Sequence, residues 1–487
     1  MIDLSIDKAG LEHSLARARQ RGILIPTFAQ MRDPGLIPAR TRDSLRRIGL
    51  WDVNPLNLFR ITWKNEPLES GGLFGPVNRL EFPSSLTGVE ARIIALVGKW
   101  FPTGAHKVGA AFGCLVPRLV TGQFDPTVQS AVWPSTGNFC RGGAYDSALL
   151  ACPSIAILPQ GMSRERFEWL SRIAGEVIRT PGGEANVKEI FDKCRELRSS
   201  GRALMIFNQF EEFGNYLWHY GVTGPALEEV LGEELGPGDS YHGVVLTTGS
   251  AGTIACGDYL KQRFPAGKIA AGEALQVPTL LQAGFGSHRI EGIGDKHVPW
   301  IHNLRNTDLV IAVDDEAVVS LARLFGEPAG RRYLAARGVP RGLVDSLDLL
   351  GFSGIANLLA AIKYARYFEL GPREVVLTVL TDSMDLYRSR LEEMRAQIGG
   401  YGEPEAAAHF ARYLLGQGSD HLAELSHPER RRIHNLKYFT WVEQQGRDQK
   451  ELNAQWADPE YWRAVQAQLP RIDALIEEFN RKTGLAD

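Results

Sequence analysis

The chain has 487 residues, of which 44% are hydrophobic and 23% are charged, and its formal net charge at pH 7 is −3. This length is enough for two or three domains, and the composition is ordinary for a soluble globular protein. The weak negative charge gives no electrostatic reason to expect binding to nucleic acid or to an anionic membrane, and no apolar run is long enough to span a bilayer.

The cysteines indicate the redox compartment. There are five, an odd and scattered set, and no Cys-x-x-Cys pair suits a metal. We therefore expect free thiols in a reducing compartment, no disulfide framework and no metal site. The first residues lack a basic segment followed by an apolar stretch, so the sequence predicts a cytoplasmic protein without a signal peptide.

Residues 1–71 carry turn signals and aromatic anchors without a strong repeat, and we interpret them as an N-terminal extension. From residue 72 to about 395, short β-rich segments alternate with helical ones. This alternation predicts parallel sheets covered by helices on both faces, and the length favours two domains over one large sheet. The predicted strands are residues 92–97, 128–133, 154–158, 176–179, 204–208, 244–247, 268–271, 309–313 and 375–380.

Residues 396–487 have a different character. A Gly-Gly-Tyr-Gly-Glu-Pro segment at residues 399–404 breaks the alternation, and apolar residues such as Trp462, Val465 and Leu469 then recur at helical spacing. We predict a helical C-terminal extension that docks on the domains or on a second subunit, in preference to a separate activity.

The segment from Pro102 to Ala111 reads as a tight polar turn between a strand and a helix, with Lys107 at the mouth of the helix. An amine placed there lies near backbone N–H groups and the positive end of the helix dipole, so its protonated form is disfavoured. A neutral amine is a nucleophile that can hold an aldehyde as a Schiff base. A surface lysine at a helix start is the alternative, and for an isolated lysine it is the commoner case.

A second turn, Thr-Thr-Gly-Ser-Ala-Gly-Thr at residues 247–253, also follows a predicted strand and opens a helix. Its glycines allow close backbone approach, and its N–H groups, hydroxyls and helix dipole favour a phosphate. Dinucleotide binding is the rival interpretation, but no Gly-x-Gly-x-x-Gly with a suitable acidic residue after it opens a βαβ unit.

Other polar segments could complete a site with these two. They are Pro-Ser-Thr-Gly-Asn-Phe at residues 134–139, Asn-Gln-Phe at 208–210, His-Arg-Ile-Glu-Gly-Ile-Gly at 288–294 and Thr-Asp-Ser at 381–383. Each taken alone is an ordinary turn or loop. Because sites in parallel α/β folds lie at the carboxyl ends of strands, we expect Lys107, Ser135, Gly249 and Ser383 to lie at one edge.

Together these segments resemble the fold-type II pyridoxal-5′-phosphate enzymes, the group of cysteine synthase, cystathionine β-synthase and the tryptophan synthase β chain. Thr-Gly-Ala-His-Lys at residues 103–107 is closest to the tryptophan synthase β chain, and the later segments are closer to cysteine synthase. The resemblance implies an α/β fold of two domains with twisted, mainly parallel sheets. The implied division is a larger cofactor-binding domain of residues 72–105 with 215–395, and a smaller mobile substrate domain of residues 106–214.

The resemblance also implies individual roles. Lys107 would hold pyridoxal 5′-phosphate and act as the catalytic base, and Ser383 would hydrogen-bond to the ring nitrogen. The other implied cofactor-binding residues are His106, Asn138, Gly249, Ser250, Ala251, Gly252, Thr253 and Gly292. The implied substrate-binding residues are Ser135, Thr136, Gly137, Phe139 and Gln209. Ala251 replaces a usual glycine, and Phe139 replaces the small hydroxyl residue of cysteine synthases and narrows the pocket.

The implied activity is β-replacement on a serine- or cysteine-type amino acid through an aminoacrylate intermediate, with a thiol or sulfide as the small nucleophile. A lyase or dehydratase of serine, threonine or cysteine is the alternative, and a cofactor-binding regulatory protein without turnover is the non-enzyme alternative. A hydroxyl at the ring nitrogen does not hold that nitrogen protonated as a carboxylate would, which favours expulsion of a β-leaving group. We also expect a homodimer.

Overall fold

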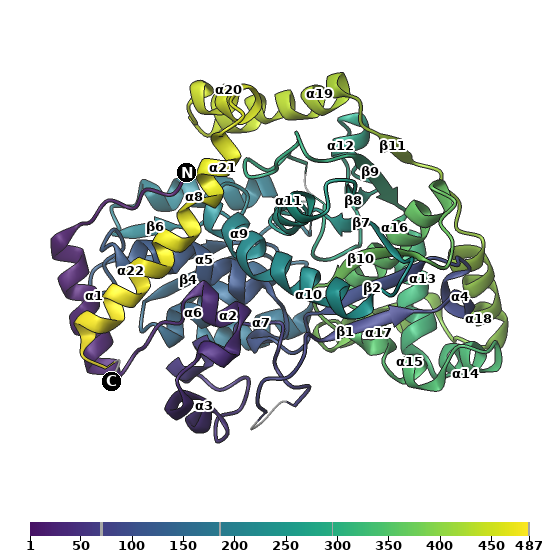
Figure 1. The fold of residues 1–487 in the computed structure, drawn as a ribbon, viewed down its shortest axis with the longest axis horizontal. Coiled ribbons are helices and arrows are strands. Elements are labelled where there is room, and N and C mark those ends of the chain that lie inside the picture. Colours follow the sequence, from purple (N-terminus) through teal and green to yellow (C-terminus); the bar gives the residue numbers. More distant parts are fainter. Residues whose placement is uncertain (69–71, 185–186, 295, 486–487) are drawn as a thin grey trace.

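The computed structural model describes residues 1–68, 72–184, 187–294 and 296–485 and has an α/β fold with two sheets, as predicted (Figure 1). In the larger sheet the described strands follow the order β1-β2-β10-β7-β8-β9-β11. The five central strands are parallel, and β1 and β11 are antiparallel edge strands. Their bounds are β1 Arg79–Phe82, β2 Arg92–Val97, β10 Glu374–Leu380, β7 Ser240–Thr247, β8 Lys268–Ala274, β9 Leu309–Val313 and β11 Leu422–Glu424.

The smaller sheet comes from one continuous part of the chain and is entirely parallel, in the order β5-β4-β3-β6. Its strands are β3 Ser130–Pro134, β4 Ser154–Pro159, β5 Glu176–Thr180 and β6 Leu204–Ile206. All nine strands predicted from the sequence are present in the two sheets, with somewhat shifted ends.

β1 and β11 are not among the strands predicted from the sequence. Both are antiparallel and lie at sheet edges, outside the strand-helix alternation on which the prediction rested. β11 adds a short strand to the C-terminal extension, for which the sequence predicts mainly helices, because residues 422–424 pair with β9. Three residues reading Leu-Ala-Glu carry no strand pattern of their own, so the exposed edge of β9 decides their conformation.

Helices cover both faces of the sheets (Figure 1). Those before β7 are α1 Lys8–Arg21, α2 Phe28–Arg32, α3 Ala39–Leu45, α4 Ser84–Thr87, α5 Lys107–Val120, α6 Asn138–Leu149, α7 Arg164–Ile173, α8 Val187–Arg198, α9 Phe213–Trp218 and α10 Gly224–Glu234. Those from β7 to β10 are α11 Ile254–Arg263, α12 Thr279–Gln282, α13 Asp315–Gly326, α14 Pro328–Ala336, α15 Arg341–Asp345 and α16 Phe352–Tyr367. The remainder are α17 Arg388–Ile398, α18 Glu403–His409, α19 His427–Lys437, α20 Gln449–Ala457, α21 Tyr461–Gln466 and α22 Gln468–Thr483.

The larger sheet is buried on both faces, which explains why its strands are nearly continuous apolar runs. Ile94 and Leu96 of β2 belong to one core cluster, which also holds residues of α5. Ile93 and Ala95 alternate to the opposite face and pack in a second cluster with α16. The two clusters hold the carboxyl ends of the parallel strands in fixed register, and those ends position the site described below.

The two chain extensions pack against each other. Figure 1 shows α22 running beside α1, on the side of the molecule that carries the smaller sheet. The Asp473 carboxylate accepts hydrogen bonds from the N–H groups of Phe28 and Ala29 at 2.7 and 3.2 Å, and Asn480 exchanges two hydrogen bonds with the backbone of Ile25. The C-terminal residues therefore hold the first turn of α2 in place.

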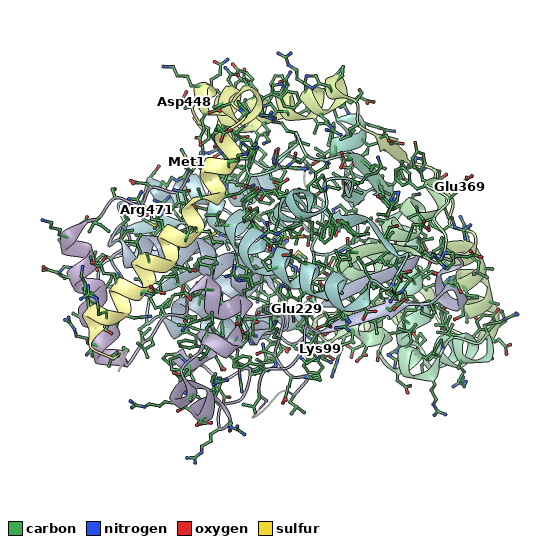
Figure 2. The ribbon with its side chains drawn as sticks, viewed as in Figure 1. Met1, Lys99, Glu229, Glu369, Asp448 and Arg471 are labelled. Atoms are coloured by element: carbon green, nitrogen blue, oxygen red, sulfur yellow. The ribbon has the colours of Figure 1, made fainter. Side chains whose placement is uncertain are left out.

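Charged side chains are spread widely over the surface. Figure 2 shows Glu369, Asp448 and Arg471 at separate places on the outside of the ribbon. Across the described ranges no helix is both long and apolar enough to cross a membrane. The same residues contain no group of three or more His, Cys, Asp or Glu side chains arranged to hold a metal ion.

Candidate active site

A cavity lies where the start of α5, the β3–α6 turn, the β7–α11 turn and residues 292–294 meet. Most of the residues proposed from the sequence line it, although they come from distant parts of the chain. These are His106, Lys107, Ser135, Thr136, Asn138, Phe139, Gln209, Gly249, Ser250, Ala251, Gly252, Thr253 and Gly292. The topology explains the meeting, because β2, β3 and β7 all direct their carboxyl ends toward this place.

Lys107 is the first residue of α5, and its Nζ donates a 2.8 Å hydrogen bond to the Ser250 hydroxyl. Burial lowers the pKa of Lys107 to about 8. A useful fraction of this amine is therefore neutral near pH 7, which is the form that reacts with an aldehyde or removes a proton.

His106 is fully buried beside Lys107, between Trp63 of the N-terminal extension and Trp218. Burial, with a smaller effect of the Lys107 charge, lowers the pKa of His106 well below its usual range, so the imidazole is neutral. Its Nε2 lies 3.3 Å from the Thr381 hydroxyl, and its Nδ1 has no hydrogen-bond partner among the described residues. The unpaired Nδ1 therefore belongs to a residue that lines the cavity.

The turn before α11 has the features of an anion site. Among the described residues, no group accepts a hydrogen bond from the backbone N–H of any residue from 249 to 253. A Cβ on Gly252 would lie 2.0 Å from Asn215 Oδ1, so only glycine fits there. Ala251 has φ of +59°, in the left-handed region that favours glycine. The turn therefore keeps the backbone shape of a glycine-rich loop despite the alanine.

The β3–α6 turn presents a second group of donors. The Ser135 hydroxyl accepts from Gly137 N–H at 3.1 Å and lies 3.3 Å from Gln209 Nε2, while Asn138 Nδ2 donates to Asp382 Oδ2 at 2.6 Å. Asn138 Oδ1 is buried without a partner among the described residues. α6 begins at Asn138, so the first N–H groups of that helix also lack intrahelical acceptors and can bind a carboxylate.

Two of the proposed residues are not part of the cavity lining. Gly137 stands behind the wall, where a Cβ would lie 2.4 Å from the Arg166 guanidinium. Ser383 is buried past the end of β10, and its hydroxyl lies 3.4 Å from Asp385 Oδ2. The strand reaches the cavity through Thr381 instead, and the Asp382 carboxylate is held by Asn138 and the Tyr387 hydroxyl.

The structure adds residues that the sequence analysis did not propose. Glu184, Val187, Phe210, Thr247, Ile293, Gly294 and Thr381 also line the cavity. Ser353, in the first turn of α16, lies behind Gly292, and its hydroxyl is buried without a hydrogen-bond partner among the described residues. Glu184 lies in the turn after β5, and Ser135 lies in the turn after β3. Its position after a predicted strand could therefore have identified Glu184 as a candidate site residue. Ser353 follows a loop, and no strand-based rule would have found it.

The donor set fits a phosphorylated aromatic aldehyde. One end of the cavity offers unpaired backbone N–H groups for a phosphate, and an amine of lowered pKa stands at the same turn, where its Nζ contacts Ser250. A family model for pyridoxal-phosphate dependent enzymes matches residues 76–337. The chain belongs to the pyridoxal-phosphate-dependent enzymes. The match spans β2, α5 and the strands of the smaller sheet. The cofactor of this enzyme is pyridoxal phosphate.

Named relatives narrow the comparison within these enzymes. The chain is 29% identical over 289 residues to a probable cysteine synthase of Bacillus subtilis, covering 59% of this chain and 85% of that protein. It is 28% identical to a cysteine synthase of Staphylococcus aureus, covering 59% of this chain and 84% of that protein. The solved structure of an O-acetylserine dependent cystathionine beta-synthase from Helicobacter pylori matches with 25% identity and a TM-score of 0.53, covering 64% of this chain and 95% of that one.

Proposed function

We propose that this pyridoxal-phosphate-dependent enzyme catalyses β-replacement: it removes a leaving group from Cβ of a serine- or cysteine-type amino acid and adds a small nucleophile there. The observation that carries the proposal is the cavity in which Lys107 lies between the 249–253 turn and the 135–139 turn. Similarity to two cysteine synthases and to a cystathionine beta-synthase supports the same reaction class.

The residues of the cavity have different roles. The N–H groups of residues 249–253 hold the cofactor phosphate, and the 135–139 turn together with Gln209 holds the substrate carboxylate. Bound pyridoxal phosphate supplies an electron sink that stabilises negative charge at Cα. Lys107 anchors the cofactor through its amine and, once displaced by the substrate amine, takes the Cα proton. Phe139 lines the same cavity, and its ring would favour a substrate with a short side chain.

Attachment at Lys107 is tested by labelling. Borohydride reduction of the holoenzyme followed by peptide mass spectrometry should place the pyridoxyl group on Lys107. Lys107→Ala should eliminate both the label and the turnover, because no other lysine lines the described part of the cavity. A label on a different lysine would contradict the assignment of the site.

The reaction type is tested with a set of amino acids. O-acetylserine, O-phosphoserine, serine, cysteine and threonine are each incubated with the holoenzyme, with and without sulfide or a small thiol. We expect a new thioether or thiol product that depends on the nucleophile, with little pyruvate. Release of pyruvate and ammonia at the same rate with and without nucleophile would instead identify a β-elimination lyase.

Three further features of the protein belong to this proposal. Residues 106–214 are proposed to form the smaller domain, moving against a larger domain of residues 72–105 with 215–395, because the two sheets are separate. Five buried thiols without disulfide partners suit a reducing, cytoplasmic setting. A homodimer remains a prediction, and sedimentation of the purified holoenzyme is its test.

A further inference from the structure

Glu184 is a buried carboxyl group in the active-site wall to which neither the sequence motifs nor the reaction described above assigns a role. It follows β5 in the smaller sheet and is 7% exposed. It lines the same cavity as Lys107 and Thr136. Burial of a carboxylate costs solvation free energy. Such a group is therefore expected either to have a partner that offsets this cost or to serve a function.

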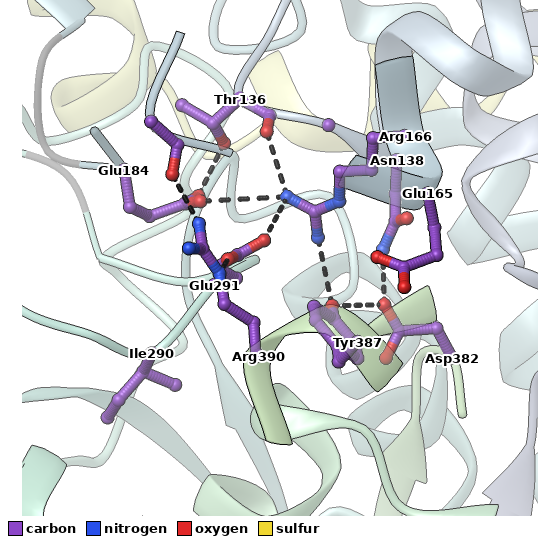
Figure 3. A network of polar contacts seen from close by, with 12 residues as sticks. Thr136, Asn138, Glu165, Arg166, Glu184, Ile290, Glu291, Asp382, Tyr387 and Arg390 are labelled. Carbon is purple, nitrogen blue, oxygen red and sulfur yellow. Dashed lines mark hydrogen bonds and ion pairs between the residues drawn. The ribbon is translucent and has the colours of Figure 1, made fainter. Parts of the chain in front are cut away.

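The two oxygens of Glu184 have different surroundings. Oε1 accepts a hydrogen bond from the Thr136 hydroxyl, in the turn assigned to the substrate carboxylate. Oε2 has no hydrogen-bond partner among the described residues, and its closest cation is Arg166 Nη1 at 3.9 Å. Figure 3 shows Glu184 between Thr136 and Arg166. The arrangement suits a neutral carboxylic acid, with its carbonyl oxygen bound to Thr136 and its proton on Oε2.

Arg166 lies farther from Glu184 than from its other partners. Nη1 contacts Glu291 Oε2 at 2.9 Å and donates to the carbonyl of Thr136 at 2.9 Å, while Nη2 donates to the Tyr387 hydroxyl at 2.9 Å. Glu291 is in turn paired with Arg390 at 2.5 Å (Figure 3). Glu291 therefore takes the Arg166 charge that would otherwise pair with Glu184.

The titration of Glu184 agrees with this geometry. Burial raises the pKa of Glu184 to about 8, with Arg166 opposing the rise and Glu291 adding to it. The charged groups that face it are thus Arg166 from α7 and Glu291 from the loop before Gly292, with Lys107 in the wall of the same cavity. Glu184 also lines a second cavity, whose wall includes Met162, Glu291 and Arg390.

We propose that Glu184 is the general acid that protonates the leaving group at Cβ, and that the enzyme therefore accepts serine, whose leaving group is a hydroxyl. The inference rests on the proposed β-replacement and assigns its substrate class. Lys107 takes the proton from Cα, the electron pair of that C–H bond forms the Cα–Cβ double bond, and the Cβ–O bond breaks. The oxygen leaves with the Glu184 proton as water. The nucleophile then enters as a thiolate and its sulfur bonds to Cβ, Lys107 returns its proton to Cα, and Glu184 regains from solvent the proton that the thiol released there.

The test compares two leaving groups in the holoenzyme. A hydroxyl needs a proton to leave, whereas chloride does not. Glu184→Gln keeps the size and the acceptor for Thr136 but cannot transfer a proton. We expect it to lower turnover of L-serine by about 10²–10⁴-fold and that of β-chloro-L-alanine by less than about threefold, because general acid catalysis contributes on that scale only where a proton is needed. Exchange of the Cα proton with deuterium, followed by NMR, should continue in the variant.

Glu291→Gln is a second variant, since Glu291 shares Arg166 with Glu184 but lies outside the lining of the active-site cavity. Without the Glu291 charge, Arg166 should stabilise the Glu184 carboxylate and lower the pKa of Glu184, so turnover of serine should fall while that of β-chloro-L-alanine changes little. An equal loss for both substrates in Glu184→Gln, or turnover of serine that falls no more than that of β-chloro-L-alanine in Glu291→Gln, would overturn the inference.

The wild-type enzyme supplies a measurement that does not depend on the folding of a variant. The ratio of serine to β-chloroalanine turnover should fall about tenfold per pH unit above pH 8, because only the protonated form of Glu184 can act as an acid. A flat ratio, or no turnover of serine while β-chloroalanine is consumed, would refute the role of Glu184 and leave β-replacement standing. Failure with every β-substituted amino acid would refute the proposed function itself.

Discussion

Lys107 should bind pyridoxal phosphate covalently over a pH range set by its own titration. With a pKa of about 8, roughly 9% of the amine is neutral at pH 7 and about 90% at pH 9, whereas an ordinary lysine of pKa near 10.4 is only about 0.04% neutral at pH 7. The rate of attachment to the apoprotein should therefore rise about tenfold from pH 7 to pH 9 and then level off.

The assay follows the absorbance of the attached cofactor after mixing apoprotein with pyridoxal phosphate at each pH. The same reaction with an N-acetyl-lysine amide corrects for titration of the cofactor itself. Ser250→Ala is the matched variant, because it removes the hydrogen-bond acceptor of Nζ, disfavours the ammonium form and should move the plateau to lower pH. A corrected rate that continues to rise beyond pH 10 would show that burial does not lower the pKa of Lys107, and the argument for its reactivity would fail.

Three further outcomes are expected. We propose that Ser353, a buried hydroxyl without a partner among the described residues behind Gly292, hydrogen-bonds to the cofactor ring nitrogen in place of Ser383. Ser353→Ala should then slow Cα proton exchange about tenfold at unchanged cofactor content, whereas Ser383→Ala should change it less than about twofold. The reverse result would restore the sequence-based assignment of Ser383 to the ring nitrogen. Ala251→Gly should leave the urea midpoint of unfolding nearly unchanged, because relief of the positive φ offsets the greater freedom of glycine in the unfolded chain. Ala251→Val should lower the free energy of unfolding by about 1–2 kcal/mol or more. Equal midpoints for the wild type and both variants would argue against the left-handed conformation. Lys437→Met should destabilise the protein by about 2–4 kcal/mol and expose the C-terminal extension to proteolysis, because Lys437 Nζ donates to the carbonyls of Trp300 and His302 and to Gln455. Lys450→Met, at an exposed position, serves as control. Equal protease resistance of the two variants would contradict the role of Lys437 in holding the extension.

The sequence was sufficient for the parts of the protein that depend on local pattern. Short apolar strands alternating with helices predicted a parallel α/β fold, because a strand buried on both faces needs apolar residues throughout its length. The sequence also identified the glycine-rich turn at residues 247–253 and the lysine at the start of α5. Both lie at helix N-termini, where unpaired backbone N–H groups bind anions whatever the side chains are, so a local strand-turn-helix pattern is enough to find them.

Relations between distant segments were decided only by the tertiary structure. Thr381, and not Ser383, lines the cavity, since the carboxyl end of β10 reaches the site through Thr381 while Asp382 is held by Asn138 and Tyr387. β11 is a strand only because the edge of β9 is there to pair with it. The neutral state of Glu184 depends on Glu291 holding Arg166, a competition between three charges separated by many residues along the chain. No local pattern encodes such a balance, because a buried charge takes its protonation state from the neighbours that folding brings to it.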